Sequence, residues 1–298
     1  MKTTKKLFLS IIIFLIVSLW LSCEREKTVY MELDLLSYNV AGLPEGLSSS
    51  QPALYTSLIS PLLNNFSIVH VQEDFCYHDS LLLYNTHLYQ TEPMPCVPNG
   101  DGLNTFSSFP ILNFERIAWN DCGGADCLTP KGFSYSKIQI GDSQIDFYNV
   151  HCNAGSNELN AAARRGNIKQ LTDYIKMHSE NEAVIVMGDF NSRYTREVDT
   201  IRTMFELGFS DAWIELVRNG DVPHFGDSLK DCEPLGTSEF CEGIDKFFYR
   251  SNDKITFRPL IYKHGDDKRF TYNNIDTLPL SDHVPTYVKM EYFFKVEE

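Results

Sequence analysis

The sequence predicts an α/β fold in which two packed β-sheets are flanked by helices. The first observation is a set of strand-length runs that stay apolar or alternate between apolar and polar residues. The second is that few segments show the three-to-four-residue apolar repeat of a helix. Many strands with a few helices between them favour two sheets with helices on their outer faces.

The predicted strands share short length and apolar character, and a hairpin turn is expected at "GDSQ" between Ile140 and Ile145. In chain order the runs are "LDLLSYNV", "FSIVHVQE", "FSYSKIQI", "IDFYNV", "AVIVM", "KFFYR" and "VPTYVKMEYFF". They begin at residues 33, 66, 133, 145, 183, 246 and 284.

Two helices are predicted. The first covers residues 158–178, with an apolar stripe made of Leu159, Ala162, Ile168, Leu171 and Ile175. Arg164 and Arg165 are expected on its solvent-facing side. The second covers residues 198–208, "VDTIRTMFELG", and is expected to end at Gly208.

The N-terminus is predicted to be a signal peptide of residues 1–22, followed by a tether of residues 23–29 and one catalytic domain of residues 30–298. A basic start precedes an apolar run of residues 7–21, about five residues short of the roughly 20 that a membrane-spanning helix needs. Cys23 directly follows Ser22, which resembles a bacterial lipoprotein signal in which Cys23 would be lipidated. Plain secretion and an uncleaved anchor are the alternatives, and all three place the domain outside the cytosol.

The chain contains eight cysteines, and an extracytoplasmic compartment allows disulfides. The expected pairs are Cys122 with Cys127, Cys232 with Cys241, and Cys76 with Cys96, which leaves Cys152 free. Zinc binding is the alternative, but no further Cys or His pair at zinc-site spacing supports it.

The formal net charge of −14 argues against tight, salt-dependent binding to a nucleic-acid backbone, which needs clustered Lys and Arg. The charge does not exclude a nuclease, because divalent metal ions can neutralise phosphates locally.

Polar side chains suited to phosphate or metal chemistry stand next to the ends of several predicted strands. They are Asn39, Glu73 and His151 after the first, second and fourth runs, Asp189 and Asn191 after the fifth, and Asp245, Asp282 and His283 before the last two. Carboxylates are ligands for Mg²⁺, a His backed by a carboxylate can act as a general base, and amides donate to phosphate oxygens. Taken singly, each has an ordinary structural explanation, such as a turn at Asp189 and Asn191.

The order Asn, Glu, His, Asp-x-Asn, Asp and Asp-His resembles the endonuclease/exonuclease/phosphatase superfamily, which includes deoxyribonuclease I and the neutral sphingomyelinases. "NTFSSFPI" is similar to its Ser-basic-Tyr-Pro segment, although Ser108 stands where a basic residue is usual. "PKGFSYSKIQI" is similar to the Lys-Gly strand start of sphingomyelinase-like members. The resemblance implies a four-layer α/β/β/α sandwich of two mixed, largely antiparallel sheets flanked by helices.

The resemblance also implies a metal site and a general base. Glu73 would be the principal Mg²⁺ ligand, with Asn39 and Asp282 close by, and Mn²⁺ is the alternative ion. His283 would be the general base that activates water, and Asp245 would orient it and stabilise its charged form.

The remaining matched residues would bind the phosphate. Asp189 and Asn191 would contact the phosphate and the attacking or leaving oxygen, and His151 would stabilise charge that develops on phosphorus. Lys131 and Asn39 are expected to contact the substrate. Together these roles amount to metal-assisted hydrolysis by in-line attack of water.

Three functions fit this resemblance. The first is an exported, sphingomyelinase-like phospholipase C that cleaves a phospholipid headgroup, which export, low basic content and "PKGF" favour. The second is an extracellular nuclease of the deoxyribonuclease I kind, and the third is a non-catalytic surface binding protein with the same fold. We expect a monomer that touches membranes peripherally.

Overall fold

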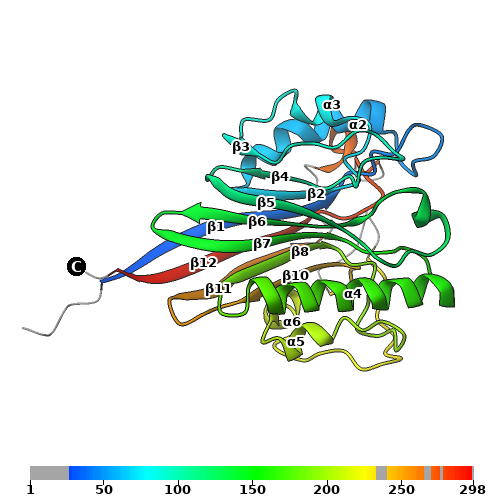
Figure 1. The fold of residues 1–298 in the computed structure, drawn as a ribbon. Helices are drawn as coiled ribbons and strands as arrows, with labels where there is room; N and C mark the ends of the chain where they lie inside the picture. Colours follow the sequence, from blue (N-terminus) through cyan, green and yellow to red (C-terminus); the bar gives the residue numbers. More distant parts are fainter. Residues whose placement is uncertain (1–26, 233–239, 265–269, 276–277, 297–298) are drawn as a thin grey trace, which may run out of the picture.

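The computed structural model describes residues 27–232, 240–264, 270–275 and 278–296. In these residues two six-stranded sheets pack face to face, and helices cover their outer faces (Figure 1). This arrangement confirms the predicted α/β/β/α sandwich of two mixed, largely antiparallel sheets. The predicted signal peptide of residues 1–22, Cys23 and the first part of the tether lie outside the described residues.

The first sheet, sheet A, has the strand order β11-β12-β1-β2-β4-β3. Its strands are β1 (Lys27–Asn39), β2 (Ile68–Gln72), β3 (Tyr89–Gln90), β4 (Asn104–Ser107), β11 (Ile255–His264) and β12 (Thr286–Val296). β1 and β2 run parallel, and the other neighbours pair antiparallel. The ends of β1 and β2 therefore meet at one edge of the sheet, where antiparallel β12 begins.

The second sheet, sheet B, has the order β5-β6-β7-β8-β10-β9. Its strands are β5 (Ile111–Ala118), β6 (Gly132–Ile140), β7 (Ser143–His151), β8 (Val184–Asp189), β9 (Ser210–Asp211) and β10 (Asp245–Arg250). β7 and β8 run parallel, and the other neighbours pair antiparallel. The predicted hairpin turn is confirmed, because β6 and β7 are joined at Gly141, which has a φ of 58°.

Helices cover the outer faces of both sheets. α2 (Pro52–Ile59), α3 (His78–Leu82) and a 3-10 helix (Ser60–Asn65) pack on sheet A, while α4 (Glu158–His178), α5 (Thr203–Glu206) and α6 (Ala212–Leu216) pack on sheet B (Figure 1). Short 3-10 helices also occur at Gly124–Leu128 and Tyr272–Asn274. Among the described residues, no helix combines the length and apolarity needed to cross a membrane.

The predicted first helix has the observed bounds of α4, but its first two turns face differently from the prediction. Ile168, Leu171 and Ile175 are buried against sheet B as expected, whereas Leu159 is 63% exposed. Arg164 is buried, and its guanidinium donates to Asp199 at 2.7 and 2.9 Å. The expectation that Arg164 faces solvent is therefore wrong, because this end of α4 packs on polar loops.

The predicted second helix is also partly wrong. Only α5 is helical there, and Gly208 follows it with a φ of 79°, as a helix end requires. Asp199, at the predicted helix start, accepts bonds from Arg164, Arg196 and the Arg193 amide. These contacts hold the chain in an irregular loop.

Five strands were not predicted from the sequence: β3, β4, β5, β9 and β11. β3 and β9 are each only two residues long. β5 and β11 are edge strands, so apolar side chains are not required on both of their faces. β11 also contains Pro259, where the pairing with β12 shifts register.

The three predicted disulfides are present, and Cys152 is a free, buried thiol. Each disulfide closes a loop close to a predicted site residue. Cys76 follows Glu73 by three residues, Cys127 precedes Lys131 by four, and Cys241 precedes Asp245 by four.

Candidate active site

The predicted site residues converge at the edge where the two parallel strand pairs end, which we call the site edge. Asn39 ends β1, Glu73 follows β2, His151 ends β7 and Asp189 ends β8. Asp245 begins β10 opposite Asp189, and His283 lies just before β12. The central strands are almost wholly buried, so their positions, and those of the side chains at their ends, are fixed by the core.

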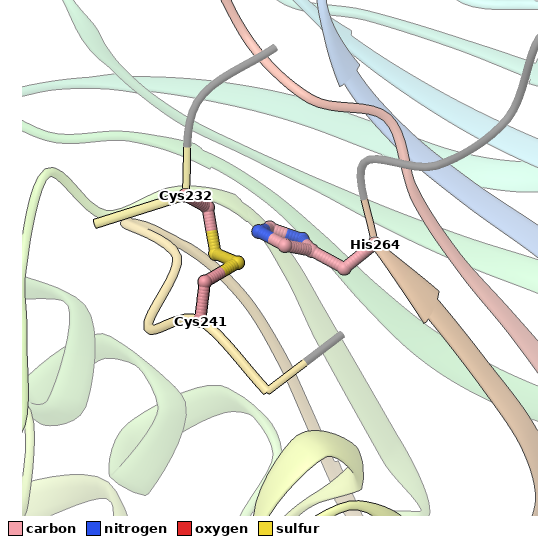
Figure 2. Close-up of side chains that lie close together, drawn as sticks. All are labelled: Cys232, Cys241 and His264. Atoms are coloured by element: carbon pink, nitrogen blue, oxygen red, sulfur yellow. A yellow bond between two sulfur atoms is a disulfide. The ribbon is translucent and has the colours of Figure 1, made fainter. Parts of the chain in front are cut away.

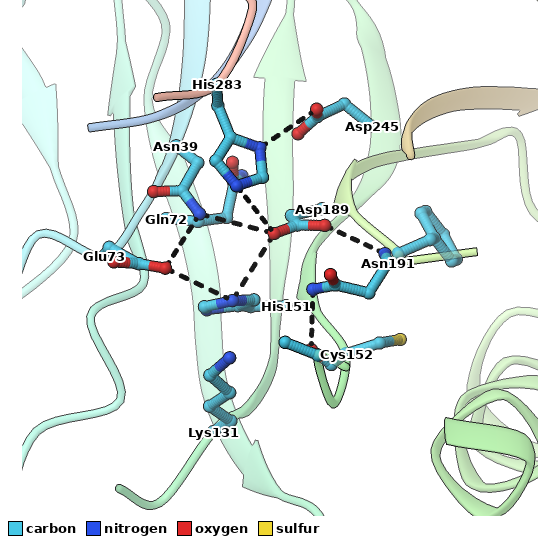
Figure 3. Close-up of polar contacts among 12 residues, drawn as sticks. Asn39, Gln72, Glu73, Lys131, His151, Cys152, Asp189, Asn191, Asp245 and His283 are labelled. Carbon is cyan, nitrogen blue, oxygen red and sulfur yellow. Dashed lines mark hydrogen bonds and ion pairs between the residues drawn. The ribbon is translucent and has the colours of Figure 1, made fainter. Parts of the chain in front are cut away.

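Asn39 links the two sheets at the centre of the site (Figure 3). Its Nδ2 donates to Glu73 Oε1 at 3.1 Å and to Asp189 Oδ2 at 3.3 Å. Its Oδ1 accepts from the amide of Ala41 at 3.0 Å. Asn39 therefore presents its NH₂ group, rather than its oxygen, to the two carboxylates.

His283 and Asp245 form an imidazole–carboxylate pair. His283 Nδ1 lies 3.2 Å from Asp245 Oδ2, and Nε2 lies 3.6 Å from Asp189 Oδ2. Burial lowers the pKa of His283, but Asp245 and Asp189 outweigh it and raise the pKa to about 10. Asp245 thus fixes one ring nitrogen, while the other faces the interior of the site.

His151 lies close to the carboxylates of Glu73 and Asp189. Its Nε2 is 3.5 Å from Asp189 Oδ2 and 3.8 Å from Glu73 Oε1. Burial, with the positive charges of Lys131 and His283, lowers the pKa of His151 well below its usual value. Within the described residues neither ring nitrogen has a hydrogen-bond partner, so the buried ring can still take one.

Asp189 and Asn191 form a tight turn at the end of β8. Asp189 Oδ1 accepts from the Asn191 amide at 2.9 Å, and Asn191 has a φ of 51°. The Asn191 side chain donates to the carbonyl of Cys152 at 3.1 Å. Burial raises the pKa of Asp189 to about 7, although nearby His283 opposes this shift. Asp189 and Asn191 therefore form a turn and also lie at the site.

Glu73 adopts a backbone conformation that is rare outside glycine, with a φ of 58°. Its carbonyl accepts from the amide of Gly42, where a Cβ atom would collide with that same oxygen. A Cβ on Gly102 would lie 3.0 Å from Glu73 Cα. The two glycines let neighbouring loops approach and hold the Glu73 side chain at the site.

Lys131 and Asp282 are placed differently from the other predicted residues. Lys131 extends toward His151 in Figure 3, and its Nζ forms an ion pair with Asp126 at 3.0 Å. Asp282 is exposed and lies 3.4 Å from Ser281 Oγ. Among the described residues Asp282 makes no direct contact with Glu73.

Three neighbours of the site were not predicted from the sequence: Ser281, Trp119 and Asp126. Ser281 Oγ donates to the carbonyl of Asn39 at 2.6 Å and accepts from the His283 amide at 3.2 Å. Trp119 Nε1 donates to the carbonyl of His151 at 2.7 Å. The position of Ser281 beside "DH" was a usable signal, whereas Trp119 is distant in sequence from its contact.

A second side-chain cluster comprises Cys232, Cys241 and His264 (Figure 2). The two sulfur atoms are bonded to each other, so only His264 keeps a free ligand atom. His264 is buried, which lowers its pKa to about 4. The cluster is therefore a disulfide packed on an imidazole, in agreement with the predicted disulfide rather than zinc.

The arrangement at the site edge supports hydrolysis of a phosphate ester. It combines an imidazole oriented by a carboxylate, a second buried imidazole, and the two carboxylates that share the Asn39 amide. The first can take a proton from water, and the others can hold a cation and a charged phosphoryl group.

Comparisons with known proteins agree with this geometry. Residues 50–289 match the model of Endonuclease/Exonuclease/phosphatase family 2. A sphingomyelinase of Mycobacterium tuberculosis is 36% identical over 276 residues, which cover 89% of this chain and 54% of the relative. The chain thus spans about half the length of that relative.

Two solved structures share the fold. A beta toxin mutant from Staphylococcus aureus with bound magnesium ions matches with a TM-score of 0.59 and 18% identity, over 87% of this chain and 99% of the toxin. D. rerio TDP2 complexed with single-strand DNA product matches with a TM-score of 0.61 and 17% identity, over 87% and 98% of the two chains. The chain therefore belongs to the endonuclease/exonuclease/phosphatase family, with sphingomyelinases among its relatives.

Proposed function

We propose that this protein is a divalent-metal-dependent phosphodiesterase. It would hydrolyse the phosphodiester bond of a phospholipid and release the phosphorylated headgroup, as a sphingomyelinase-like phospholipase C does. The observation that carries the proposal is the contact of His283 with Asp245, next to the carboxylates of Asp189 and Glu73. The 36% identity to a sphingomyelinase supports the lipid substrate.

The donor atoms at the site suit a hard divalent cation. Glu73 Oε1 and Asp189 Oδ2 both lie within 3.3 Å of Asn39 Nδ2, and Glu73 is partly exposed. Mg²⁺ takes one or two carboxylates together with water and phosphate oxygens, and Mn²⁺ accepts the same donors. Glu73 would hold the ion, with Asp189 near and Asp282 at the rim. When bound, the ion would stabilise negative charge on the phosphoryl group.

The protein's own residues account for the other steps. Asp245 holds Nδ1 of His283, so Nε2 is the nitrogen that would take the proton of the attacking water. Asp245 and Asp189 raise the pKa of His283 to about 10, and a cation held by the neighbouring carboxylates would lower it toward the range in which Nε2 can act as a base. The Asn39 amide, Lys131 and the free ring nitrogen of His151 are placed to donate to phosphoryl oxygens. Asp189 and Asn191 position the water at the end of β8. No covalent enzyme intermediate is needed.

A side-by-side assay with sphingomyelin, phosphatidylcholine and duplex DNA tests the function. We expect Mg²⁺-dependent release of phosphocholine, loss of turnover in EDTA, and no cleavage of DNA. His283→Ala is the matched control for contaminating activity. Cleavage of DNA without lipid turnover would identify the nuclease, and binding without any turnover would identify a non-catalytic protein.

We also propose that the chain is exported and lipid-anchored at Cys23. The basic start, the apolar run of residues 7–21 and the position of Cys23 support this. Fractionation of cells that express the full chain tests it, since Cys23→Ala should move the protein from the membrane to the soluble fraction. Retention of this variant in the membrane would contradict lipidation.

A further inference from the structure

A cavity of about 320 Å³ opens beside the site edge. Its lining includes Trp119, Asp121, the loop closed by Cys122 and Cys127, and Lys131. We call it the Trp119 pocket. Its volume is near the lower limit of small-molecule sites, so it suits a compact group rather than a whole lipid or a nucleotide chain.

The Trp119 pocket is directly joined to the proposed catalytic residues. Trp119 Nε1 donates to the carbonyl of His151, and Lys131, which extends toward His151, forms part of the pocket wall. A phosphate placed at the site edge would therefore have one of its substituents next to this pocket.

The side chains that line the Trp119 pocket carry a net negative charge. Lys131 is neutralised by Asp126 at 3.0 Å, and Asp126 also accepts from the Ala154 amide at 2.6 Å. The carboxylate of Asp121 has neither an ion pair nor a hydrogen bond to any other described residue. The surplus charge of the pocket therefore comes from Asp121, and it favours a cationic group.

The walls of the pocket are held in place before any ligand binds. A disulfide joins Cys122 to Cys127, and the Gly123 amide donates to Asn153 Oδ1 at 2.6 Å. The absence of a side chain at Gly166 lets the Asp121 carboxylate lie against α4. A site that is already ordered loses little entropy when it binds a small group.

We propose that the Trp119 pocket binds the quaternary ammonium of a phosphocholine-type headgroup and thereby selects the substrate. A quaternary ammonium donates no hydrogen bond, so it is recognised by an aromatic ring, a carboxylate and apolar contacts. Trp119 and Asp121 supply the first two, and Leu128 and Pro130 in the lining supply apolar surface. This inference rests on the proposed function and adds the residues that determine headgroup specificity.

The test compares two soluble p-nitrophenyl phosphodiesters, the choline ester and its uncharged 3,3-dimethylbutyl isostere. We expect the wild-type protein to prefer the choline ester at least about tenfold in kcat/KM, because only this ester places a cation near the unpaired carboxylate. Asp121→Asn should remove most of that preference. Asp173→Asn is the matched control, because Asp173 lies on α4 outside the pocket lining and pairs with Lys169.

A direct binding measurement separates this inference from the proposed function. Phosphocholine alone should change the fluorescence of the wild-type protein, and Trp119→Phe should abolish the change. One outcome separates the two hypotheses: the protein binds phosphocholine, Asp121→Asn weakens this binding, and neither ester is hydrolysed. That outcome would support the pocket assignment and refute the proposed phosphodiesterase function. Equal kcat/KM for the two esters, or an unchanged preference in a folded Asp121→Asn variant, would overturn the pocket assignment. Parallel assays with sphingomyelin and phosphatidylcholine vesicles show whether the same residues act on a lipid-borne headgroup.

Discussion

The two sheets contribute to the site with the same topology but with different chemistry. In each sheet a parallel pair ends at the site edge, and an antiparallel neighbour begins there: β1 and β2 with β12 in sheet A, and β8 and β7 with β10 in sheet B. Sheet A supplies Asn39, Glu73 and His283, and sheet B supplies His151, Asp189 and Asp245.

The difference between the sheets lies in exposure. Glu73 and His283 have side chains that are 19% and 16% exposed, whereas those of His151, Asp189 and Asp245 are at most 2% exposed. Sheet A therefore provides the two more exposed groups, Glu73 and His283, while its Asn39 is buried. Sheet B provides the buried groups that contact them, His151, Asp189 and Asp245. Two of the close contacts cross between the sheets, Asn39 Nδ2 to Asp189 Oδ2 and His283 Nδ1 to Asp245 Oδ2, so the complete site exists only when the sheets are packed together.

Loss of the exposed carboxylate of sheet A should have the largest effect. We expect Glu73→Gln to reduce Mg²⁺-dependent turnover by at least about 10³-fold, because metal assistance is worth several kcal/mol. Circular dichroism should show an intact fold. Turnover that persists in EDTA would show that Glu73 does not act through a metal.

The His283–Asp245 contact tests whether partners from opposite sheets act as one unit. We expect His283→Ala to lower kcat by at least about 10²-fold with KM nearly unchanged, as loss of a general base does. Asp245→Asn should also lower kcat, and the double variant should be no slower than His283→Ala. Additive losses would mean that Asp245 does not act through His283.

The packing between the sheets predicts a pH dependence of stability. His70 in sheet A is buried with its Nδ1 3.4 Å from the carbonyl of Met187 in sheet B, and burial lowers the pKa of His70 to about 3. Below about pH 6.5 the unfolded chain binds a proton that folded His70 does not, so this residue should cost about 1.4 kcal/mol of stability per pH unit down to its folded pKa. Urea unfolding at pH 7.5 and 4.5 measures the loss, which His70→Gln should reduce. An equal loss in both proteins would assign the effect to other groups.

The smallest effect is expected at a contact within sheet A. Ser281 Oγ connects the carbonyl of Asn39 to the amide of His283. We expect Ser281→Ala to lower kcat about three- to tenfold, since a hydrogen bond of this kind contributes about 1 kcal/mol. The pH profile should keep its shape, because the base itself remains. A loss as large as that of His283→Ala would give Ser281 a more direct role.

The sequence predicted the strands of the core more reliably than the surface around them. "AVIVM" and "LDLLSYNV" are buried on both faces or alternate clearly, so their pattern indicates their structure. The edge strand β5 and the irregular segment around Asp199 depend on neighbours far away in the chain, which local pattern does not encode. The buried Arg164 was missed for the same reason.

The same limit applies to the site. The residues at strand ends were identified from their places next to apolar runs and from the resemblance of their order to the family. The structure brings together Asn39, Glu73, His151, Asp189, Asp245 and His283. The orientation of the Asn39 amide is set by hydrogen bonds with Glu73, Asp189 and Ala41, and that of the Asn191 amide by one with Cys152. Local sequence pattern does not encode such contacts. Trp119 reaches His151 only because β5 lies beside β6 in the folded sheet.

The location of the disulfides suggests what chemical reduction would do to the molecule. The three bonds join loops that lead into or out of the site edge, and the buried core around Val186 and Phe147 is held by apolar contacts instead. A reducing environment would therefore loosen the loops around the site edge while the core stays folded. The protein would keep its fold but lose the geometry of its site, and reoxidation would restore that geometry without refolding.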